Sequence, residues 1–346
     1  MTRYLVIVNQ FAGTCGLQGD LELRIRRALA PARVTLLRTA SPDEARLEAA
    51  RARRAGFDGV ITVGGDGTHH WVVDALAGGD VPLGVIPLGT ANDLAAELGI
   101  ERDVEAACRV FREGGRARID LVHATTGPRG ASRGKAFATA GGMGLCTDVA
   151  LGVCEARKRS RAFHWLMRQL GGLIYQLYMV WLLAFGRRLE HAYRLEQEDG
   201  TTRDVEAYMA LVMNQAFLGK NFQAVPDASN RDGAFDVLLI KKHGWLPRLR
   251  LVATVATTLR AGHIGRADVE VVRARRLEVH AARPEAFFAD GEHLGTTDRF
   301  VFRALPRALP VFVPLDRAEE RAPARRDAVA SGFGSGSGSG SGLFAA

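Results

Sequence analysis

The sequence predicts an α/β protein in which an N-terminal open parallel-sheet domain is followed by a C-terminal, mainly antiparallel β-sandwich domain. Two patterns support this prediction. The first 124 residues alternate short Val- and Ile-rich runs with stretches of helical periodicity, whereas the segments beyond about residue 137 have strand character and few helices. The length of 346 residues is sufficient for two domains, each with its own core.

The N-terminal part contains five predicted strands. Each of the first four ends in a turn rich in Gly, Pro, Asn or Thr and precedes a helical stretch, so we expect parallel strands joined by right-handed crossovers. In such a sheet the ligand site lies at the carboxyl ends of the strands. The predicted strands are Tyr4–Val8, Arg33–Leu37, Gly59–Val63, Leu83–Ile86 and Ala117–His123.

The C-terminal part is predicted to be mostly antiparallel. Helices are expected there only near 155–186 and 245–262. Gly and other turn residues separate the remaining segments, which is typical of short strands joined by tight connections. The predicted strand segments are 137–145, 207–215, 233–242, 268–281 and 298–315.

A stretch rich in Gly, Pro and Ser near 121–135 marks the boundary between the two parts. We therefore expect domains at 1–124 and 125–316. The remaining residues, 317–346, form a tail whose Gly/Ser repeat is typical of a flexible linker, and it takes no part in the fold prediction.

The composition is that of a globular protein with one basic segment. Apolar residues make up 47% and charged residues 24%, which excludes disordered and fibrous chains. The formal net charge of +8 is local, because residues 155–188 hold seven Lys or Arg and one Glu within the most hydrophobic stretch. This pairing favours contact with an anionic membrane surface and argues against a nucleic-acid partner.

The cysteines and the N-terminus favour a cytoplasmic location. Cys15, Cys108, Cys146 and Cys154 show no CxxC spacing, which indicates a reducing compartment and no cysteine-bound metal. The apolar run at the N-terminus is too short for the core of a signal peptide. We expect a cytoplasmic protein that associates peripherally with the inner face of the membrane.

Glycine-bearing turns follow three of the predicted strands. The third strand runs into Gly64–Thr68 and then a helix, where backbone amides and the helix N-terminus can approach a phosphate. Within this turn Asp66 can bind a nucleotide-associated Mg²⁺ and Thr68 can donate to phosphate oxygens. The fourth strand leads into Pro87–Ala95 and the first into Asn9–Thr14. One such turn is equally consistent with a capped tight turn, but three at one sheet edge favour a phosphate site.

The sequence GGDGT followed by PLGTANDLA resembles the diacylglycerol kinase catalytic family, which also includes sphingosine kinases and bacterial lipid kinases. The resemblance spans most of the chain, and the GxxxxGK[ST] motif of P-loop enzymes is absent. Gln10 stands in place of the proline of the family's first loop. His70-Trp71 stands where bacterial members often have Asn-Glu. Trp71 in this position resembles the eukaryotic-type diacylglycerol kinases. The resemblance implies a nucleotide-binding α/β domain with the binding residues Asn9, Gly13, Thr39, Gly64, Gly65, Asp66, Gly67, Thr68, Gly89, Thr90, Asn92 and Asp93.

The resemblance also implies two catalytic carboxylates. Ala289–Glu292 matches an Asp-Gly-Glu motif whose glutamate acts as general base, so that role falls on Glu292, with Asp66 as its catalytic partner. Phosphoryl transfer depends mainly on positioning and charge stabilisation, and a carboxylate takes the proton of the attacking hydroxyl. Glu292 taken alone is also consistent with a solvated turn carboxylate.

A structural Mg²⁺ site is implied further along the chain. Val225–Ile240 matches a family segment whose first aspartate holds the ion, which assigns Asp232 together with backbone carbonyls near Ser229 and Ala234. An ordinary Asp-Gly turn is the alternative for Asp232.

Simpler roles remain open for other polar residues. Thr39, at a strand end, is also consistent with a helix cap. His69 and His70 cannot share one helix face and are expected to face solvent or to pack beside the turn. No histidine spacing suggests a zinc site.

The basic, apolar segment at about 155–188 is predicted to be a helix. From Gln169 to Phe185 there are 17 residues without a charge, at the lower limit for crossing a bilayer, and Gly171-Gly172 and Gln176 interrupt them. These features favour a helix at the membrane interface or beside a lipid pocket. A buried core helix and a transmembrane span are the alternatives.

Together the resemblance implies an ATP- and Mg²⁺-dependent lipid kinase that converts diacylglycerol to phosphatidic acid at an anionic membrane surface. A sphingosine- or ceramide-type lipid kinase shares the nucleotide motifs, an NAD kinase shares GGDGT, and a catalytically silent lipid-binding membrane adaptor is a further alternative. The sequence leaves open whether the chain forms a homodimer.

Overall fold

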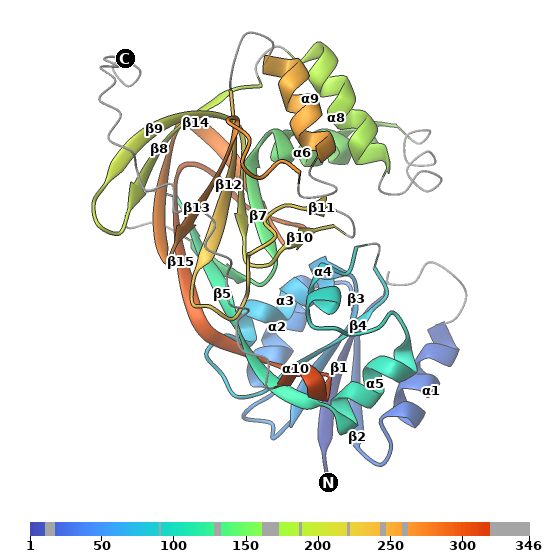
Figure 1. Ribbon diagram of the computed structural model, residues 1–346. Coiled ribbons are helices and arrows are strands. Elements are labelled where there is room, and N and C mark those ends of the chain that lie inside the picture. Colours follow the sequence, from blue (N-terminus) through green and yellow to red (C-terminus); the bar gives the residue numbers. More distant parts are fainter. Residues whose placement is uncertain are drawn as a thin grey trace.

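The computed structural model describes residues 1–10, 18–89, 91–127, 133–160, 173–186, 189–219, 222–242, 247–257 and 262–318. In these parts thirteen strands form one continuous sheet and two short strands form a separate hairpin (Figure 1). The strands are β1 (Arg3–Asn9), β2 (Arg33–Thr39), β3 (Gly59–Gly64), β4 (Leu83–Pro87), β5 (Gly115–Thr126), β6 (Arg133–Phe137), β7 (Ala140–Gly144), β8 (His191–Gln197), β9 (Thr202–Met213), β10 (Phe217–Leu218), β11 (Phe222–Gln223), β12 (Phe235–Lys241), β13 (Val269–Ala274), β14 (Arg276–Ala289) and β15 (Glu292–Val313). The helices are α1 (Gln18–Ala28), α2 (Pro42–Arg51), α3 (Asp66–Leu76), α4 (Asp93–Glu97), α5 (Val104–Glu113), α6 (Leu145–Arg159), α8 (Leu173–Phe185), α9 (Pro247–Thr257) and α10 (Leu315–Ala318).

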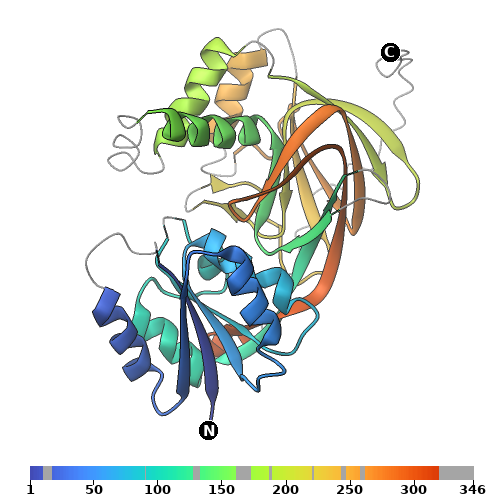
Figure 2. The same ribbon diagram turned by 180° about the vertical axis from the view of Figure 1, so that it is seen from behind.

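The N-terminal half is built on four parallel strands in the order β2-β1-β3-β4. The first four predicted strands are observed as β1 to β4 with nearly the predicted bounds. Helices α1 and α5 lie on one face of these strands and α2 and α3 on the other (Figures 1 and 2). Parallel pairing brings the carboxyl ends of β1, β3 and β4, and the turns that follow them, to one edge.

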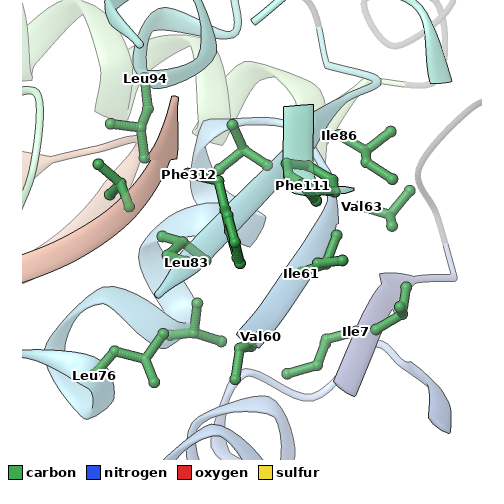
Figure 3. Packing of buried hydrophobic residues seen from close by; sticks show 14 of the residues in the cluster. Ile7, Val60, Ile61, Val63, Leu76, Leu83, Ile86, Leu94, Phe111 and Phe312 are labelled. Atoms are coloured by element: carbon green, nitrogen blue, oxygen red, sulfur yellow. The ribbon is translucent and has the colours of Figure 1, made fainter. Parts of the chain in front are cut away.

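The last strand of the chain completes the core of the N-terminal half. Figure 3 shows Ile61, Val63 and other side chains of β1, β3 and β4 packed with Phe111 of α5 and Phe312 of β15. The Phe312 ring centroid lies 5.5 Å from that of Phe111 and 6.1 Å from that of Tyr4. Strand β15 therefore contributes to both halves of the molecule.

The fifth predicted strand, Ala117–His123, is observed within β5 but does not extend the parallel set. It pairs antiparallel with β15 and with β6, and it is β15 that meets β4, through the pair Val311 and Leu83. A strand contributed by the C-terminal end of the chain cannot be anticipated from the local βα alternation of the first 124 residues.

The C-terminal half is mainly antiparallel, as predicted. Strands β9 and β14 each pair with both β7 and β8, so this part of the sheet curves back on itself around a second core. Alternate residues of β9 and β12 point to the two faces, as strand geometry requires. In β12, Val237 and Leu239 enter the second core, whereas Leu238 and Ile240 enter a third core covered by α6, α8 and α9.

The prediction of a single helix at about 155–188 is wrong. Helix α6 ends at Arg159, Ser160 has an extended backbone with φ −133° and ψ 119°, and α8 begins at Leu173. Each helix has its own buried residues, with Val149 and Val153 of α6 and Leu183 of α8 in the third core. Residues 161–172, 187 and 188 lie outside the described part of the chain, as do 319–346 of the predicted tail.

Among the described residues, no helix combines the length and apolar character needed to cross a membrane.

Candidate active site at the meeting point of three turns

The first turn lies between β3 and α3. All of β3 is buried, and the chain leaves it through Gly64 and Gly65 to begin α3 at Asp66. A Cβ on Gly64 would lie 2.4 Å from the Thr68 hydroxyl, so a side chain there would displace Thr68. The Asn9 side chain at the end of β1 donates from Nδ2 to the Thr68 oxygen at 2.9 Å. The ends of β1 and β3 are thus joined by a side-chain hydrogen bond.

The second turn, after β4, lies against the first. A Cβ on Gly89 would lie 2.4 Å from the Gly65 Cα atom, so the two backbones approach more closely than any other residue would allow. Asn92, in the left-handed region at φ 59°, holds this turn by accepting from the Gly89 amide at 2.8 Å and donating to its carbonyl at 3.0 Å. Of the predicted nucleotide residues, Gly13 and Thr90 lie outside the described residues.

Asp66 joins the two turns. Its carboxylate accepts hydrogen bonds from the amides of Asn92 at 2.8 Å and Leu94 at 3.3 Å at the start of α4. Burial raises the pKa of Asp66 above its usual value, and the negative charge of Asp290 adds to the effect. Asp66 therefore has a structural role in this turn as well as its predicted catalytic one.

Asp93 connects the second turn to the C-terminal half. Its Oδ2 accepts from the amide of Gly219, which follows β10, at 2.6 Å. Burial raises the pKa of Asp93 to about 6, and the carboxylates of Asp66 and Asp290 act in the same direction. Three acidic side chains thus influence one another where the two halves meet.

The third turn lies between β14 and β15 and carries Asp290 and Glu292. Asp290 is buried, adopts a positive φ of 48°, and accepts from the Ala138 amide at 2.8 Å and the Thr139 amide at 2.9 Å. His70 of α3 lies with Nδ1 3.2 Å from the same carboxylate. Burial acts to raise the pKa of Asp290, but these hydrogen bonds outweigh it and the pKa is lowered.

Glu292 is held beside the first turn. Trp71 of α3 donates from Nε1 to Glu292 Oε1 over 3.4 Å, and a Cβ on Gly67 would lie 3.3 Å from the same oxygen. Gly65, Gly89 and Glu292, predicted from separate motifs, therefore belong to one site. The Glu292 carboxylate therefore lies next to the backbone amides at the N-terminus of α3. Amides in that position can bind an anionic ligand.

Thr39 is placed at the end of β2, opposite Asn9 in the pairing of β2 with β1. Its hydroxyl accepts from the Ser41 amide at 2.9 Å and also bonds Glu44, while Ser41 caps α2. These contacts tie Thr39 to its own loop. A small pocket beside it is lined by Val8, Asn9, Gln10, Leu21, Glu22, Ile25, Leu36 and Arg38.

The predicted structural metal residues form a separate group. The Asp232 carboxylate pairs with Arg273 at 3.1 Å and accepts from the Ala234 amide at 3.1 Å, while the Ser229 hydroxyl accepts from the Arg231 amide. Arg273 thus already neutralises the charge of Asp232. The metal role of Asp232 stays a prediction.

Three contributors to these sites were not identified from the sequence. Asp120 of β5 accepts from the amides of Gly233 at 2.6 Å and Arg307 at 2.7 Å, and so fixes the turn that carries Asp232. Thr139 and His70 anchor Asp290.

The two histidines of α3, His69 and His70, were expected to face solvent or to pack beside the turn. Both are buried, and burial lowers the pKa of His69 to about 4. Trp71, the residue after His70, resembles the eukaryotic members of the family. This likeness was the signal in the sequence that pointed to this part of α3.

Comparison with known proteins gives two family matches. Residues 3–124 match a model described as the diacylglycerol kinase catalytic domain, and residues 149–313 match the YegS C-terminal NAD kinase beta sandwich-like domain. The chain is 33% identical over 243 residues to a diacylglycerol kinase of Bacillus subtilis, covering 69% of this chain and 72% of that protein. It is 29% identical over 253 residues to a diacylglycerol kinase of Mycobacterium tuberculosis, covering 72% of this chain and 75% of that protein.

Solved structures share the fold. A diacylglycerol kinase of Bacillus anthracis superposes with a TM-score of 0.69 at 20% identity, covering 90% of this chain and 96% of that chain. A yeast NADH kinase superposes with a TM-score of 0.55 at 10% identity, covering 92% and 85%. The N-terminal α/β part and the β-sandwich-like part thus occur together in known kinases.

Proposed function

The chain belongs to the diacylglycerol kinase catalytic-domain family, and from that premise we propose that it transfers the γ-phosphate of ATP to the hydroxyl of diacylglycerol, giving phosphatidic acid. The observation that carries the proposal is the position of the Glu292 carboxylate, beside Gly67 and the glycine turns. A kinase site needs a phosphate cradle and a base within reach of the attacking hydroxyl, and both lie at one edge of this sheet.

The phosphates bind at the first two turns. Gly65 and Gly67 leave backbone amides accessible at the N-terminus of α3, an eleven-residue helix whose dipole favours negative charge. The contact of Gly89 with Gly65 keeps the second turn beside the first, so both turns can hold one triphosphate. Asn9 keeps the Thr68 hydroxyl oriented within this cradle.

Asp66 and Asp93 fit the magnesium ion that accompanies ATP. Burial raises the pKa of both carboxyl groups, the charge of Asp290 adds to the effect on each, and Asp66 adds to the effect on Asp93. Oxygen ligands of this kind are those that magnesium prefers. When bound, magnesium neutralises charge that develops on the phosphate oxygens. Asp232 fits less well, because Arg273 already pairs with it.

Glu292 accepts the proton of the lipid hydroxyl. As that proton leaves, the hydroxyl oxygen bonds to the γ-phosphorus and the bond from phosphorus to the bridging oxygen breaks, releasing ADP. Trp71 orients the carboxylate through its indole N–H. Asp290, anchored by His70 and Thr139, fixes the turn that presents Glu292, so the base is positioned before the substrate arrives.

Diacylglycerol is proposed as the acceptor because Trp71 is the residue that eukaryotic-type diacylglycerol kinases share with this chain. Diacylglycerol resides in bilayers and ATP in the cytoplasm. We therefore place the reaction at the cytoplasmic face of an anionic membrane.

A product assay with several acceptors tests the proposal. Purified protein is incubated with ATP and magnesium together with vesicles that contain diacylglycerol, sphingosine or ceramide, or with NAD in solution, and products are identified by mass spectrometry. Phosphatidic acid should form fastest. Faster phosphorylation of a sphingoid lipid or of NAD would contradict the choice of acceptor, and no phosphorylated product from any of them would indicate a lipid-binding adaptor.

A further inference from the structure

Helix α8 presents an apolar face to solvent. Leu177, Trp181 and Phe185 follow one another at four-residue intervals, Val180 lies beside Trp181, and the exposed fractions of these four residues range from 49% to 72%. The opposite side, with Met179, Leu182 and Leu183, packs in the third core. We call the four exposed residues the α8 face. Groups of this kind on a protein surface mark sites of interaction.

The α8 face has the aromatic character of a membrane interface. The Trp181 ring centroid lies 5.5 Å from that of Tyr178 and 6.2 Å from that of Phe185, so three aromatic rings form a row along the helix. Trp and Tyr combine a large apolar area with a polar tip, which suits the boundary between acyl chains and head groups.

A basic side chain borders the α8 face. Arg248 of α9 donates to the carbonyls of Leu183 at 3.5 Å and Gly186 at 2.6 Å, which places a guanidinium at the C-terminal end of α8 next to Phe185. Exposed Val252 follows Arg248 by one helical turn. Figures 1 and 2 both show α6, α8 and α9 grouped together. In sequence these three helices contain five Lys or Arg and two Asp or Glu, and α8 and α9 contain no acidic residue.

We propose that the α8 face docks on an anionic lipid bilayer, with α8 lying in the plane of the interface. This inference rests on the proposed function and deepens it by assigning the membrane-binding surface. Over its 13 described residues α8 is about 20 Å long, shorter than the roughly 30 Å hydrocarbon core, which suits a helix that lies on a bilayer. The basic residues bind lipid head groups while Trp181 and Phe185 enter the outer acyl region.

The docking surface is connected to the candidate active site by one strand. The Ala140 carbonyl at the start of β7 accepts from the Asp290 amide at 3.0 Å, and β7 runs to Gly144, where α6 begins. A five-residue strand spans about 16 Å. Helix α6 in turn packs on α8, where Gly152 lies against the Tyr178 ring. Docking through α8 therefore holds the turn carrying Glu292 at a fixed distance from the lipid surface.

A second copy of the chain is the competing occupant of this face. The excess of basic residues on the three helices disfavours it, because two copies paired here would bring like charges together. An anionic bilayer complements the same charges.

Vesicle flotation with a matched pair of variants tests the proposal. The α8 variant combines Leu177→Ser, Trp181→Ser and Phe185→Ser, at positions 49%, 52% and 72% exposed. The control combines Leu23→Ser, Leu47→Ser and Leu315→Ser, at positions 45%, 49% and 67% exposed on helices of the N-terminal half. The probe is vesicles of equal parts phosphatidylglycerol and phosphatidylcholine, compared with phosphatidylcholine alone.

Wild type and control should float with the anionic vesicles, whereas the α8 variant should bind them about a hundredfold more weakly. Equal binding by the α8 variant and the control would overturn the proposal. A second outcome would also overturn the proposal: wild type is a dimer in sedimentation analysis, the α8 variant is a monomer, and both bind vesicles equally. The α8 face would then join two copies of the chain.

A second assay separates this inference from the proposed function. With a short-chain diacylglycerol dispersed in detergent micelles, both variants should phosphorylate the lipid at the wild-type rate, since no bilayer is needed. Wild-type protein that phosphorylates this substrate but fails to bind vesicles refutes docking alone. Wild-type protein that binds vesicles but phosphorylates no lipid refutes the kinase assignment alone.

Discussion

Asp290 keeps its negative charge in a buried position because four hydrogen bonds converge on it. The amides of Ala138 and Thr139, the Thr139 hydroxyl and His70 Nδ1 all contact its carboxylate. Since an ionised carboxylate only accepts hydrogen bonds, His70 is the donor in its pair with Asp290. Nearby Asp66 and Asp93 have fewer donors, and their pKa values are raised instead. The number of donors therefore decides whether the pKa of each buried carboxyl group is lowered or raised.

The raised pKa of Asp93 gives a pH-dependent prediction. The pKa of Asp93 is about 6 in the folded protein and 3.8 in the unfolded chain, so the folded protein binds this proton more tightly. Ionisation of Asp93 therefore lowers the unfolding free energy as the pH rises from about 4 to above 6. The full cost is at most about 3 kcal/mol. Asp93→Asn should therefore raise the thermal midpoint at pH 8, and the gain should shrink to nothing at pH 4. Thermal unfolding from pH 4 to 8 measures this.

The exposed Asp298→Asn on β15 is the control for Asp93→Asn and should change the midpoint little at any pH. A wild-type protein that is more stable than Asp93→Asn at pH 8, or a difference independent of pH, contradicts this account of Asp93.

The contact between Gly65 and Gly89 predicts a steric effect. Gly89→Ala puts a methyl group 2.4 Å from the Gly65 Cα atom, and because backbone cannot move aside cheaply, we expect a loss of about 1–3 kcal/mol in unfolding free energy together with weaker ATP binding. Gly262→Ala is the control, since its Cβ meets nothing closer than 3.6 Å. Urea unfolding and calorimetric ATP titration give both values. Normal ATP affinity in Gly89→Ala would mean that the two turns do not bind the phosphates together.

The motifs were sufficient to predict that Gly65, Gly89 and Glu292 share one site, because each motif follows or precedes a strand whose end meets the same sheet edge. They were not sufficient to identify Thr139 or Asp120. These residues act through hydrogen bonds to chain segments more than 100 residues away, and a lone Thr or Asp has no local pattern that reveals such a partner.

At the scale of elements, α6 and α8 show where periodicity misleads. The predicted helix joined the basic end of α6 to the apolar α8, yet the chain is extended at Ser160 and the two helices pack on each other. Gly152 permits this packing, because a Cβ there would lie 2.2 Å from the Tyr178 hydroxyl oxygen. By contrast β1 to β4 were predicted closely, since each is a short run of strand character bounded by turn residues.

A double-mutant cycle tests the packing of α6 on α8. Gly152→Ala should destabilise wild type by about 1–3 kcal/mol through collision with the Tyr178 ring. In a Tyr178→Ala background the same change should stabilise by about 0.5–1 kcal/mol, because Ala is the better helix former. Chemical unfolding of the four proteins measures the cycle. The same sign in both backgrounds would show that these two residues are not in contact.

At the scale of the whole molecule, β5 and β15 run through both halves. The end of β15 supplies Leu309, Val311 and Phe312 to the N-terminal core, while its beginning carries Glu292. One strand therefore connects the core beneath the glycine turns with the base above them, which favours a fixed geometry between the two.

Phe312→Ala tests this connection. Removing a ring that packs on Phe111 and Tyr4 should cost about 3–5 kcal/mol in unfolding free energy and should weaken ATP binding, although Phe312 lies far from the N-terminal half in sequence. Exposed Leu315→Ala is the control. Denaturant unfolding followed by circular dichroism gives the stability. A loss below about 1 kcal/mol would show that the N-terminal core is complete without β15.

The most direct test of the account is single-turnover phosphoryl transfer by Glu292→Gln, measured beside ATP affinity and with Asp298→Asn as the control. Removing the proton acceptor while leaving the phosphate turns intact should lower the transfer rate at least about a hundredfold and leave both ATP affinity and the thermal midpoint close to wild type. Transfer at the wild-type rate in Glu292→Gln would show that Glu292 is not the base and would contradict the proposed mechanism.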